Sequence, residues 1–366
     1  MSIKNIKRFN KIPDYVAGLD INDVKKKYGL NKIIKLASNE NPYPLPAATV
    51  KKICKFVPNV RLYPDMEYKQ IRFAIAEFSN VKPDNIILGN GSDEIFDFIF
   101  KAFLSFNSKV VMPAPSFAIY KILSGIYNSK VNVIPLQENN DFQYDVDKFI
   151  KALSAKPDAV ILCNPNNPTG TYINDESINR IIENLSDNTI LIVDEAYFNF
   201  VTKHDFPDMI KLIKKYKNKN IIVTRTFSKL FGIAGLRLGY GIANKEIIKI
   251  LNKVRMPFNI NTVAEKTASL LIKDAKYIND IQRKINDTRE FFCSELDKLG
   301  IDYIPSQTNF ILVKCNKKGE TVFKEFLKYG IIIRSYKDKE LRNYVRVTIG
   351  TKKEMILFLK ILKKLK

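Results

Sequence analysis

The chain has 366 residues, 46% of them hydrophobic, and a formal net charge of +22. This composition excludes a disordered or fibrous chain, and the length favours two packed domains. No apolar run is long enough to span a membrane, and the N-terminus lacks the apolar core of a secretory signal, so we expect a cytoplasmic protein without a membrane partner.

The positive charge has two interpretations, a nucleic-acid partner or a lysine-rich solvated surface. Lysines run along the whole chain, for example at 25–27 and 211–219, and acidic residues are interleaved with them. The sequence has no arginine-rich arm and no RNA-binding aromatic motif. We therefore expect a solvated surface and no nucleic-acid partner, while a non-enzymatic basic nucleic-acid binder stays as an alternative.

Cysteine and histidine usage limits the chemistry further. The four cysteines form no CxxC pair, and the single histidine, His204, lies in the polar stretch "TKHD". We expect no metal site, no disulfide framework and no histidine-based triad, with His204 on the surface.

In chain order, short β-branched runs alternate with amphipathic segments. The strands predicted in this way are 85–89, 109–113, 159–164, 189–195 and 220–226. Helices are predicted between them. One covers 92–104, with its apolar face formed by Ile95, Phe98, Ile99, Ala102 and Phe103. The alternation predicts an α/β fold with a mostly parallel sheet sandwiched by helices.

The C-terminal third changes character. A long helical region over about 262–299 is followed by short strands and two more helices, which predicts a smaller α+β domain. We predict a large α/β domain over 46–264, and a small domain formed by 1–45 together with 265–366.

Polar residues follow the carboxyl ends of four predicted strands, where an open parallel sheet binds its ligands. They are the amides of Gly91, Ser92 and Asp93, and the side chains of Asn167, Asp194, Tyr197, Ser228, Lys229 and Arg237. We expect these groups to gather around one crevice.

The stretch "GNGSDE" suits a phosphate group, because Gly91 and Ser92 would open a helix whose free N–H groups attract an anion. The side chains of Asp93 and Glu94 would have to point away from that anion. Further phosphate partners would be Arg237, Thr226 and Ser228.

The remaining groups suit an aldehyde-bearing aromatic ring. Lys229 could form an imine, Asp194 could pair with a protonated ring nitrogen, and Tyr197 with Asn167 could bind a phenolate oxygen. Together with the phosphate cradle they describe a pyridoxal 5′-phosphate site. Close backbone approach is predicted at the glycines between the lysine and the arginine, Gly232 and Gly235.

Nearly the whole chain resembles the fold-type-I pyridoxal-phosphate-dependent aminotransferases. The wider family is marked by "NPNNPTG" (164–170), "DEAY" (194–197) and "SK…GLRLGY" (228–240). The histidinol-phosphate branch is indicated by "SNENPYP" (38–44) together with "RVTIGT" (346–351). The resemblance implies the fold of that family, its cofactor and an active homodimer.

The resemblance also implies roles at the cofactor. Lys229 would carry the cofactor and shuttle the proton, and Asp194 would hold the pyridine nitrogen. Tyr197 and Asn167 would bind the ring oxygen. The phosphate would be held by the amides of Ser92 and Asp93 and by Ser228 and Arg237, with Thr226 as a weaker candidate, and by Tyr63 from the neighbouring subunit.

Substrate roles follow in the same way. Arg346 would bind the carboxylate of glutamate, Arg334 would bind the phosphate of histidinol phosphate, and Asn39 would face the substrate, as would Tyr63 and Asn167. One position departs from the branch, because the ring-stacking residue, often tyrosine, is Phe117 here. Stacking is kept, and any hydroxyl hydrogen bond is lost.

The implied reaction is a ping-pong transamination. L-Histidinol phosphate and 2-oxoglutarate would give imidazole-acetol phosphate and L-glutamate, in L-histidine biosynthesis. The alternatives are an aromatic amino acid aminotransferase acting on phenylalanine or tyrosine and, less favoured, a phosphothreonine decarboxylase.

Overall fold

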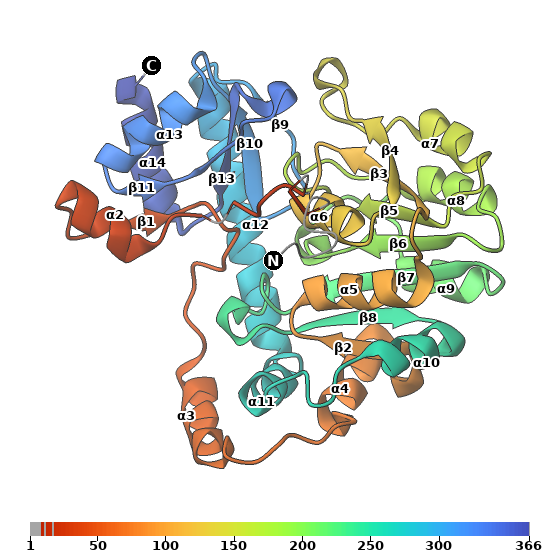
Figure 1. The fold of residues 1–366 in the computed structure, drawn as a ribbon. Helices are drawn as coiled ribbons and strands as arrows, with labels where there is room; N and C mark the ends of the chain where they lie inside the picture. Colours follow the sequence, from red (N-terminus) through yellow and green to blue (C-terminus); the bar gives the residue numbers. More distant parts are fainter. Residues whose placement is uncertain (1–8, 11, 17, 366) are drawn as a thin grey trace, which may run out of the picture.

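The computed structural model describes residues 9, 10, 12–16 and 18–365 (Figure 1). Its larger sheet has seven strands in the order β2-β8-β7-β6-β5-β3-β4. The strands are β2 (Ile86–Gly89), β3 (Lys109–Ala114), β4 (Lys130–Pro135), β5 (Ala159–Cys163), β6 (Ile190–Asp194), β7 (Asn220–Thr226) and β8 (Gly239–Ala243). Only β8 runs antiparallel to its neighbours among these strands, so the predicted mostly parallel α/β sheet is confirmed.

Two of the seven strands were not predicted. β4 lies at the sheet edge with most of its residues exposed, so it lacks the continuous apolar run of a buried strand. β8 contains Gly239 and Gly241, which weaken a strand signal. A Cβ on Gly239 would collide with the backbone nitrogen of Ser92, so glycine is required where this strand passes the start of the helix that begins at Ser92.

Helices cover both faces of this sheet (Figure 1). One face packs on α5 (Ser92–Phe103), α6 (Ala118–Ile126) and α10 (Lys245–Val254). The other packs on α7 (Val146–Leu153), α8 (Asp175–Glu183) and α9 (Met209–Lys215). Ile161 and Leu162 of β5 belong to opposite clusters, as the two-residue period of a strand buried on both faces requires.

The smaller sheet is antiparallel, in the order β12-β13-β10-β9. Its strands are β9 (Tyr303–Ile304), β10 (Phe310–Lys314), β12 (Arg334–Ser335) and β13 (Tyr344–Thr348), with α13 (Gly319–Lys328) and α14 (Lys352–Leu365) beside them. The helical region predicted over about 262–299 is confirmed and consists of two helices, α11 (Thr262–Leu271) and α12 (Ala275–Lys298). Asp274 caps the second helix by accepting a hydrogen bond from the N–H of Tyr277, which separates the two.

The N-terminal segment joins the C-terminal third through β1 (Ile34–Lys35), which pairs in parallel with β11 (Ile331–Ile332). The remaining helices are α2 (Ile21–Tyr28), α3 (Ala47–Phe56) and α4 (Lys69–Ser79). Short 3-10 turns cover Val57–Asn59, Pro83–Asn85, Glu138–Asn140, Phe198–Phe200, Ala234–Leu236 and Lys339–Leu341.

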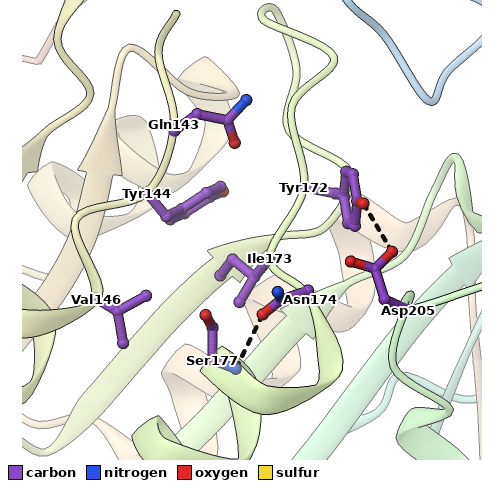
Figure 2. Close-up of a pocket in the computed structure, with 8 residues that line it drawn as sticks. All are labelled: Gln143, Tyr144, Val146, Tyr172, Ile173, Asn174, Ser177 and Asp205. Carbon is purple, nitrogen blue, oxygen red and sulfur yellow. Dashed lines mark hydrogen bonds between the residues drawn. The ribbon is translucent and has the colours of Figure 1, made fainter. Parts of the chain in front are cut away.

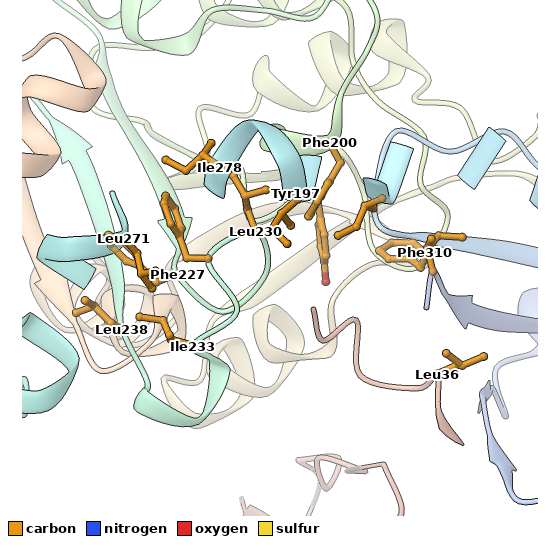
Figure 3. Packing of buried hydrophobic residues seen from close by; sticks show 14 of the residues in the cluster. Leu36, Tyr197, Phe200, Phe227, Leu230, Ile233, Leu238, Leu271, Ile278 and Phe310 are labelled. Atoms are coloured by element: carbon orange, nitrogen blue, oxygen red, sulfur yellow. The ribbon is translucent and has the colours of Figure 1, made fainter. Parts of the chain in front are cut away.

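One apolar cluster connects the two sheets. It contains Tyr197 and Leu230 after the strands of the larger sheet, Phe310 of the smaller sheet and Leu36 of the N-terminal segment (Figure 3). The division into a domain over 46–264 and a second over 1–45 with 265–366 stays a prediction. No helix in the described part of the chain is long and apolar enough to cross a membrane.

Candidate active site

Lys229 follows β7 and is half-buried. Its Nζ donates to the carbonyl oxygen of Ser38 at 3.0 Å and lies 5.8 Å from the ring centroid of Tyr197. Burial, together with the charge of Arg346, lowers the pKa of Lys229 to about 8. No carboxylate within the described residues forms an ion pair with this amine, so a fraction of it is uncharged near neutral pH and able to act as a nucleophile or base.

Asp194 is the last residue of β6 and is only 3% exposed. Its Oδ2 accepts a hydrogen bond from the hydroxyl of Tyr120 at 2.6 Å, and its Oδ1 accepts from the N–H of Ala196 at 3.1 Å and from Thr224 at 3.3 Å. Burial raises the pKa of Asp194 to about 6, whereas these donors act in the opposite direction. The carboxylate is thus held in one orientation and is suited to pair with a cation.

Tyr197 brings three distant segments together. Its hydroxyl oxygen accepts from the amide of Asn39 at 3.0 Å and from the amide of Asn167 at 3.3 Å, and its ring stands edge-on to Phe310 at 5.1 Å. Asn39 is itself held by Thr348, which accepts from its backbone N–H at 3.0 Å. The predicted residues Tyr197, Asn167 and Asn39 therefore form one hydrogen-bonded group.

The start of α5 faces Arg237. Gly91 precedes the helix with a φ of 83°, and no side chain caps it. A Cβ on Gly91 would meet the guanidinium of Arg237, so a larger residue would displace that group from the start of the helix. The first N–H groups of a helix have no intrahelical acceptor, and together with the guanidinium they form a set of donors for an anion.

The two acidic residues at the start of α5, Asp93 and Glu94, point in different directions. Glu94 points away from Arg237, because its Oε2 accepts from the N–H of Asn90 at 2.6 Å and from Asn259 at 2.7 Å. Asp93 instead lies with Oδ2 at 3.5 Å from the guanidinium of Arg237. Arg237 has a φ of 56°, a left-handed conformation that costs energy outside glycine and is typical of functional sites.

The segment between Lys229 and Arg237 is only partly as expected. Ser228 is buried, and its N–H donates to Thr226 Oγ1 at 3.1 Å, so both residues lie at the end of β7. Gly232 has a φ of 70°, which favours glycine. The close approach predicted at Gly235 is wrong, because a Cβ there would meet no atom within 4 Å.

Two predicted residues lie at the periphery of this group. Phe117 precedes α6, with its ring edge-on to Tyr120 at 5.7 Å. Tyr63 lies between α3 and α4, is 82% exposed and stacks on Phe258 at 4.5 Å. No described hydrogen bond or ring contact joins Tyr63 to the other site residues within one chain.

The smaller sheet contributes what we call the small-sheet cluster, Arg334, Tyr336 and Arg346. Arg334 pairs directly with Arg346 across β12 and β13. Arg346 is buried and donates to the side-chain oxygen of Asn167 and, at 2.6 Å, to the carbonyl oxygen of Ala37, while its Nε has no partner in the described part of the chain. Arg346 thereby reaches the same hydrogen-bonded group as Tyr197.

Several residues in contact with this site were missed by the sequence interpretation. Tyr120 lies three residues after Phe117, the predicted ring-stacking residue, but carried no expected role. Ser38 acts through its carbonyl group, which no side-chain pattern reveals. The only signal for Tyr336 was its position two residues after Arg334.

The pocket in Figure 2 is a separate feature, lined by none of the predicted site residues. Its polar groups bind one another: the hydroxyl of Tyr172 donates to Asp205 at 2.7 Å, and the N–H of Ser177 donates to the side chain of Asn174 at 3.0 Å. The chemistry-bearing residues lie instead between the two sheets.

Comparison with known proteins gives a consistent result. The family model of aminotransferase class I and II matches residues 31–362. A histidinol-phosphate aminotransferase of Carboxydothermus hydrogenoformans is 37% identical over 98% of each chain.

Solved structures agree. The histidinol-phosphate aminotransferase of Clostridium acetobutylicum superposes with a TM-score of 0.83 at 30% identity, over 91% of this chain and 99% of that chain. That of Sinorhizobium meliloti, solved in complex with pyridoxal-5′-phosphate, has a TM-score of 0.89 at 22% identity over 100% of this chain and 99% of that chain, and shows the same fold. With a family model that covers nearly the whole length and relatives of this similarity, the chain belongs to the aminotransferase class I and II family.

Proposed function

We propose that the protein is a pyridoxal-phosphate-dependent histidinol-phosphate aminotransferase. It transfers the amino group of L-histidinol phosphate to 2-oxoglutarate, giving imidazole-acetol phosphate and L-glutamate in L-histidine biosynthesis. The observation that carries the proposal is the convergence of one weakly basic lysine, one buried aspartate and one buried arginine at the junction of the two sheets. Its relatives of 36–37% identity bear the same name.

The residues fit the cofactor. The uncapped start of α5 with Arg237 offers donors to a phosphate, Asp194 offers a buried carboxylate to a pyridinium, and Lys229 offers an amine with a lowered pKa to an aldehyde. When bound, pyridoxal phosphate supplies the electron-withdrawing ring that makes the substrate's Cα proton acidic. Ser92, Asp93, Thr226 and Ser228 complete the phosphate site, and Phe117 covers the ring.

The protein's own groups perform the proton transfer and the positioning. Lys229 would hold the cofactor through its amine at the aldehyde carbon, and its free amine would move the proton at the substrate's Cα. Ser38 holds its Nζ at 3.0 Å, on the side of the N-terminal segment. Asn167 and Tyr197 donate to the ring oxygen, and Asn39 fixes the tyrosine.

The substrate is held from the smaller sheet. Arg346 binds the carboxylate of glutamate, and Arg334 binds the phosphate of histidinol phosphate. Planar guanidinium groups suit both anions, because each can donate two parallel hydrogen bonds to a carboxylate or a phosphate. The same pair can therefore serve both half-reactions of a ping-pong cycle.

The active unit is a homodimer in which Tyr63 reaches the cofactor phosphate and substrate of the neighbouring subunit. Support comes from an apolar surface around this residue: Val60 is 57%, Leu62 is 53% and Met66 is 47% exposed, beside the stacked pair of Tyr63 and Phe258. A second copy is the partner that would cover it. We place the enzyme in the cytoplasm, in line with four cysteines that are all free.

Steady-state kinetics test the substrate. With 2-oxoglutarate as acceptor, kcat/KM for histidinol phosphate should exceed that for phenylalanine by at least about 100-fold, because phenylalanine has no phosphate and leaves Arg334 without its anion. A preference for phenylalanine would make this an aromatic aminotransferase, and release of CO2 from O-phosphothreonine would make it a decarboxylase.

Sedimentation tests the dimer. We expect a dimer for the unmodified protein and a shift towards monomer for Leu62→Lys, which puts a charge into the apolar surface. Ile356→Lys, at a position on α14 that is also about half exposed, is the control and should stay dimeric. A monomeric unmodified enzyme with full activity would refute the shared site.

A further inference from the structure

The small-sheet cluster contains a phenol that neither the expected roles nor the described hydrogen bonds account for. Tyr336 is partly exposed as a residue, yet its hydroxyl oxygen is buried and has no hydrogen-bond partner among the described residues. Leaving such a group unpaired costs free energy, so it marks a place where a ligand atom supplies the missing partner.

The strand geometry places this phenol beside both arginines. Arg334 and Arg346 are direct partners across β12 and β13, and directly paired residues point to the same face of a sheet. Leu312 is the direct partner of Arg346 across β10 and β13 and therefore points to that face as well. Tyr336 is the first residue after β12. It packs against the apolar cluster that contains Leu312 and Tyr344, which belong to this sheet.

Two guanidinium groups directly opposite each other repel, so this face is built for an anion. The Nε of Arg346 is buried without a partner, and no side-chain partner of Arg334 lies within the described residues. The side chains of the cluster thus hold donors in excess. The carboxylate of Asp338 acts on Tyr336 from nearby, but it forms no ion pair with either arginine among the described residues. The charges of both arginines also act on Tyr336, as the lowering of its pKa by each of them indicates, although burial raises that pKa overall.

We propose that the hydroxyl of Tyr336 donates a hydrogen bond to the phosphate of the phosphorylated amine substrate and makes the site discriminate between a phosphate and a carboxylate. A carboxylate has two oxygens, which the two guanidinium groups satisfy. A phosphate monoester has three free oxygens, and the phenol serves the third. This inference rests on the proposed function, since it assigns a further residue to the same substrate site.

The test separates the two half-reactions. The cofactor-bound enzyme is mixed with histidinol phosphate or with glutamate under single-turnover conditions, and the change in cofactor absorbance is followed. Tyr336→Phe should raise the half-saturating concentration of histidinol phosphate by about 10- to 100-fold, the usual effect of losing a hydrogen bond to a charged group. The reaction with glutamate should change less than about threefold, because the carboxylate that glutamate places in this cluster has only two oxygens, and both keep their guanidinium donors.

Tyr172→Phe is the matched control, because it removes a hydroxyl that binds Asp205 in the separate pocket of Figure 2. It should change neither half-reaction. Equal losses for both substrates in Tyr336→Phe, or no loss for histidinol phosphate, would overturn the assignment.

A second measurement keeps this inference separate from the proposed function. Inorganic phosphate should inhibit the glutamate half-reaction of the unmodified holoenzyme competitively, and Tyr336→Phe should need about tenfold more phosphate for the same inhibition. If the unmodified enzyme does not use histidinol phosphate as a substrate, the proposed function fails. The expected difference in inhibition by inorganic phosphate would still support the role of Tyr336. Unchanged inhibition by phosphate would refute that role.

Discussion

The two sides of the site differ in how far the protein satisfies its own polar groups. At the larger sheet, Asp194 accepts three hydrogen bonds, and the hydroxyl of Tyr197 accepts two. At the smaller sheet, Arg346 Nε and the hydroxyl of Tyr336 are buried and have no partner among the residues that the structure describes. The first side is preassembled for a group that stays, and the second keeps donors free for substrates that come and go.

Lys229→Ala changes the side of the site at the larger sheet and should have the largest effect on kcat. Removal of the amine deletes both the bond to the cofactor and the proton carrier, so kcat should fall by at least about a thousandfold. The variant should also lose the visible absorbance of the covalently bound cofactor that borohydride abolishes in the unmodified enzyme. Lys211→Ala, at a highly exposed lysine on α9, is the control and should stay yellow and active. A yellow, active Lys229→Ala would end the assignment.

Arg346→Lys attacks the other side. The charge remains, but the planar fork and the contacts with Asn167 and Ala37 are lost, so kcat/KM should fall by about 10- to 100-fold for both substrates. The cofactor spectrum should be unchanged, because Asp194 and Lys229 are intact. Loss of the cofactor from this variant would show that the two sides are not separable.

Asp194→Asn tests how much the buried carboxylate of Asp194 lowers the free energy of unfolding of the cofactor-free protein. Burial raises the folded-state pKa of Asp194 from 3.8 to about 6, so above pH 6 the cofactor-free protein carries a buried charge that the unfolded chain would hold in water. The variant should be more stable than the unmodified apoprotein there, by up to about 3 kcal/mol. The advantage should shrink as pH falls from about 6 towards 4, because the folded protein then takes up the proton.

Urea unfolding of both apoproteins at pH 5 and pH 8 measures this difference. The same variant should bind the cofactor more weakly, since it lacks the charge for the ring nitrogen. A variant less stable than the unmodified apoprotein at pH 8 would show that the hydrogen bonds to Asp194 outweigh its burial.

Phe117→Tyr should have the smallest effect. The ring and its edge-on contact with Tyr120 are kept, and one hydroxyl is added at a partly exposed position, so kcat/KM should change by less than about threefold. Phe117→Leu, which removes the aromatic face, is the contrasting variant and should lose more. A large change in Phe117→Tyr would mean that this hydroxyl is decisive in the family branch.

Sequence patterns alone predicted most of the larger sheet and the residues at its strand ends. Continuous apolar runs mark β5, β6 and β7, because strands buried on both faces need no polar residue. The residue types that follow these strands indicate the chemistry, because an amine, a carboxylate and a phosphate-binding turn can be recognised from the sequence alone. The edge strand β4 and the glycine-bearing β8 were missed because they lack that pattern.

The tertiary structure alone decided how the two sides meet. Asn39 and Thr348 are 309 residues apart in the chain and share a hydrogen bond, and the parallel pairing of β1 with β11 is of the same kind. Hydrophobic periodicity and secondary-structure propensity contain information about residues only a few positions apart in the chain. Pairings between distant residues depend instead on how whole helices and strands pack. Which polar atoms stay unpaired, as in Tyr336 and Arg346, depends on the same packing, and no single-residue pattern contains it.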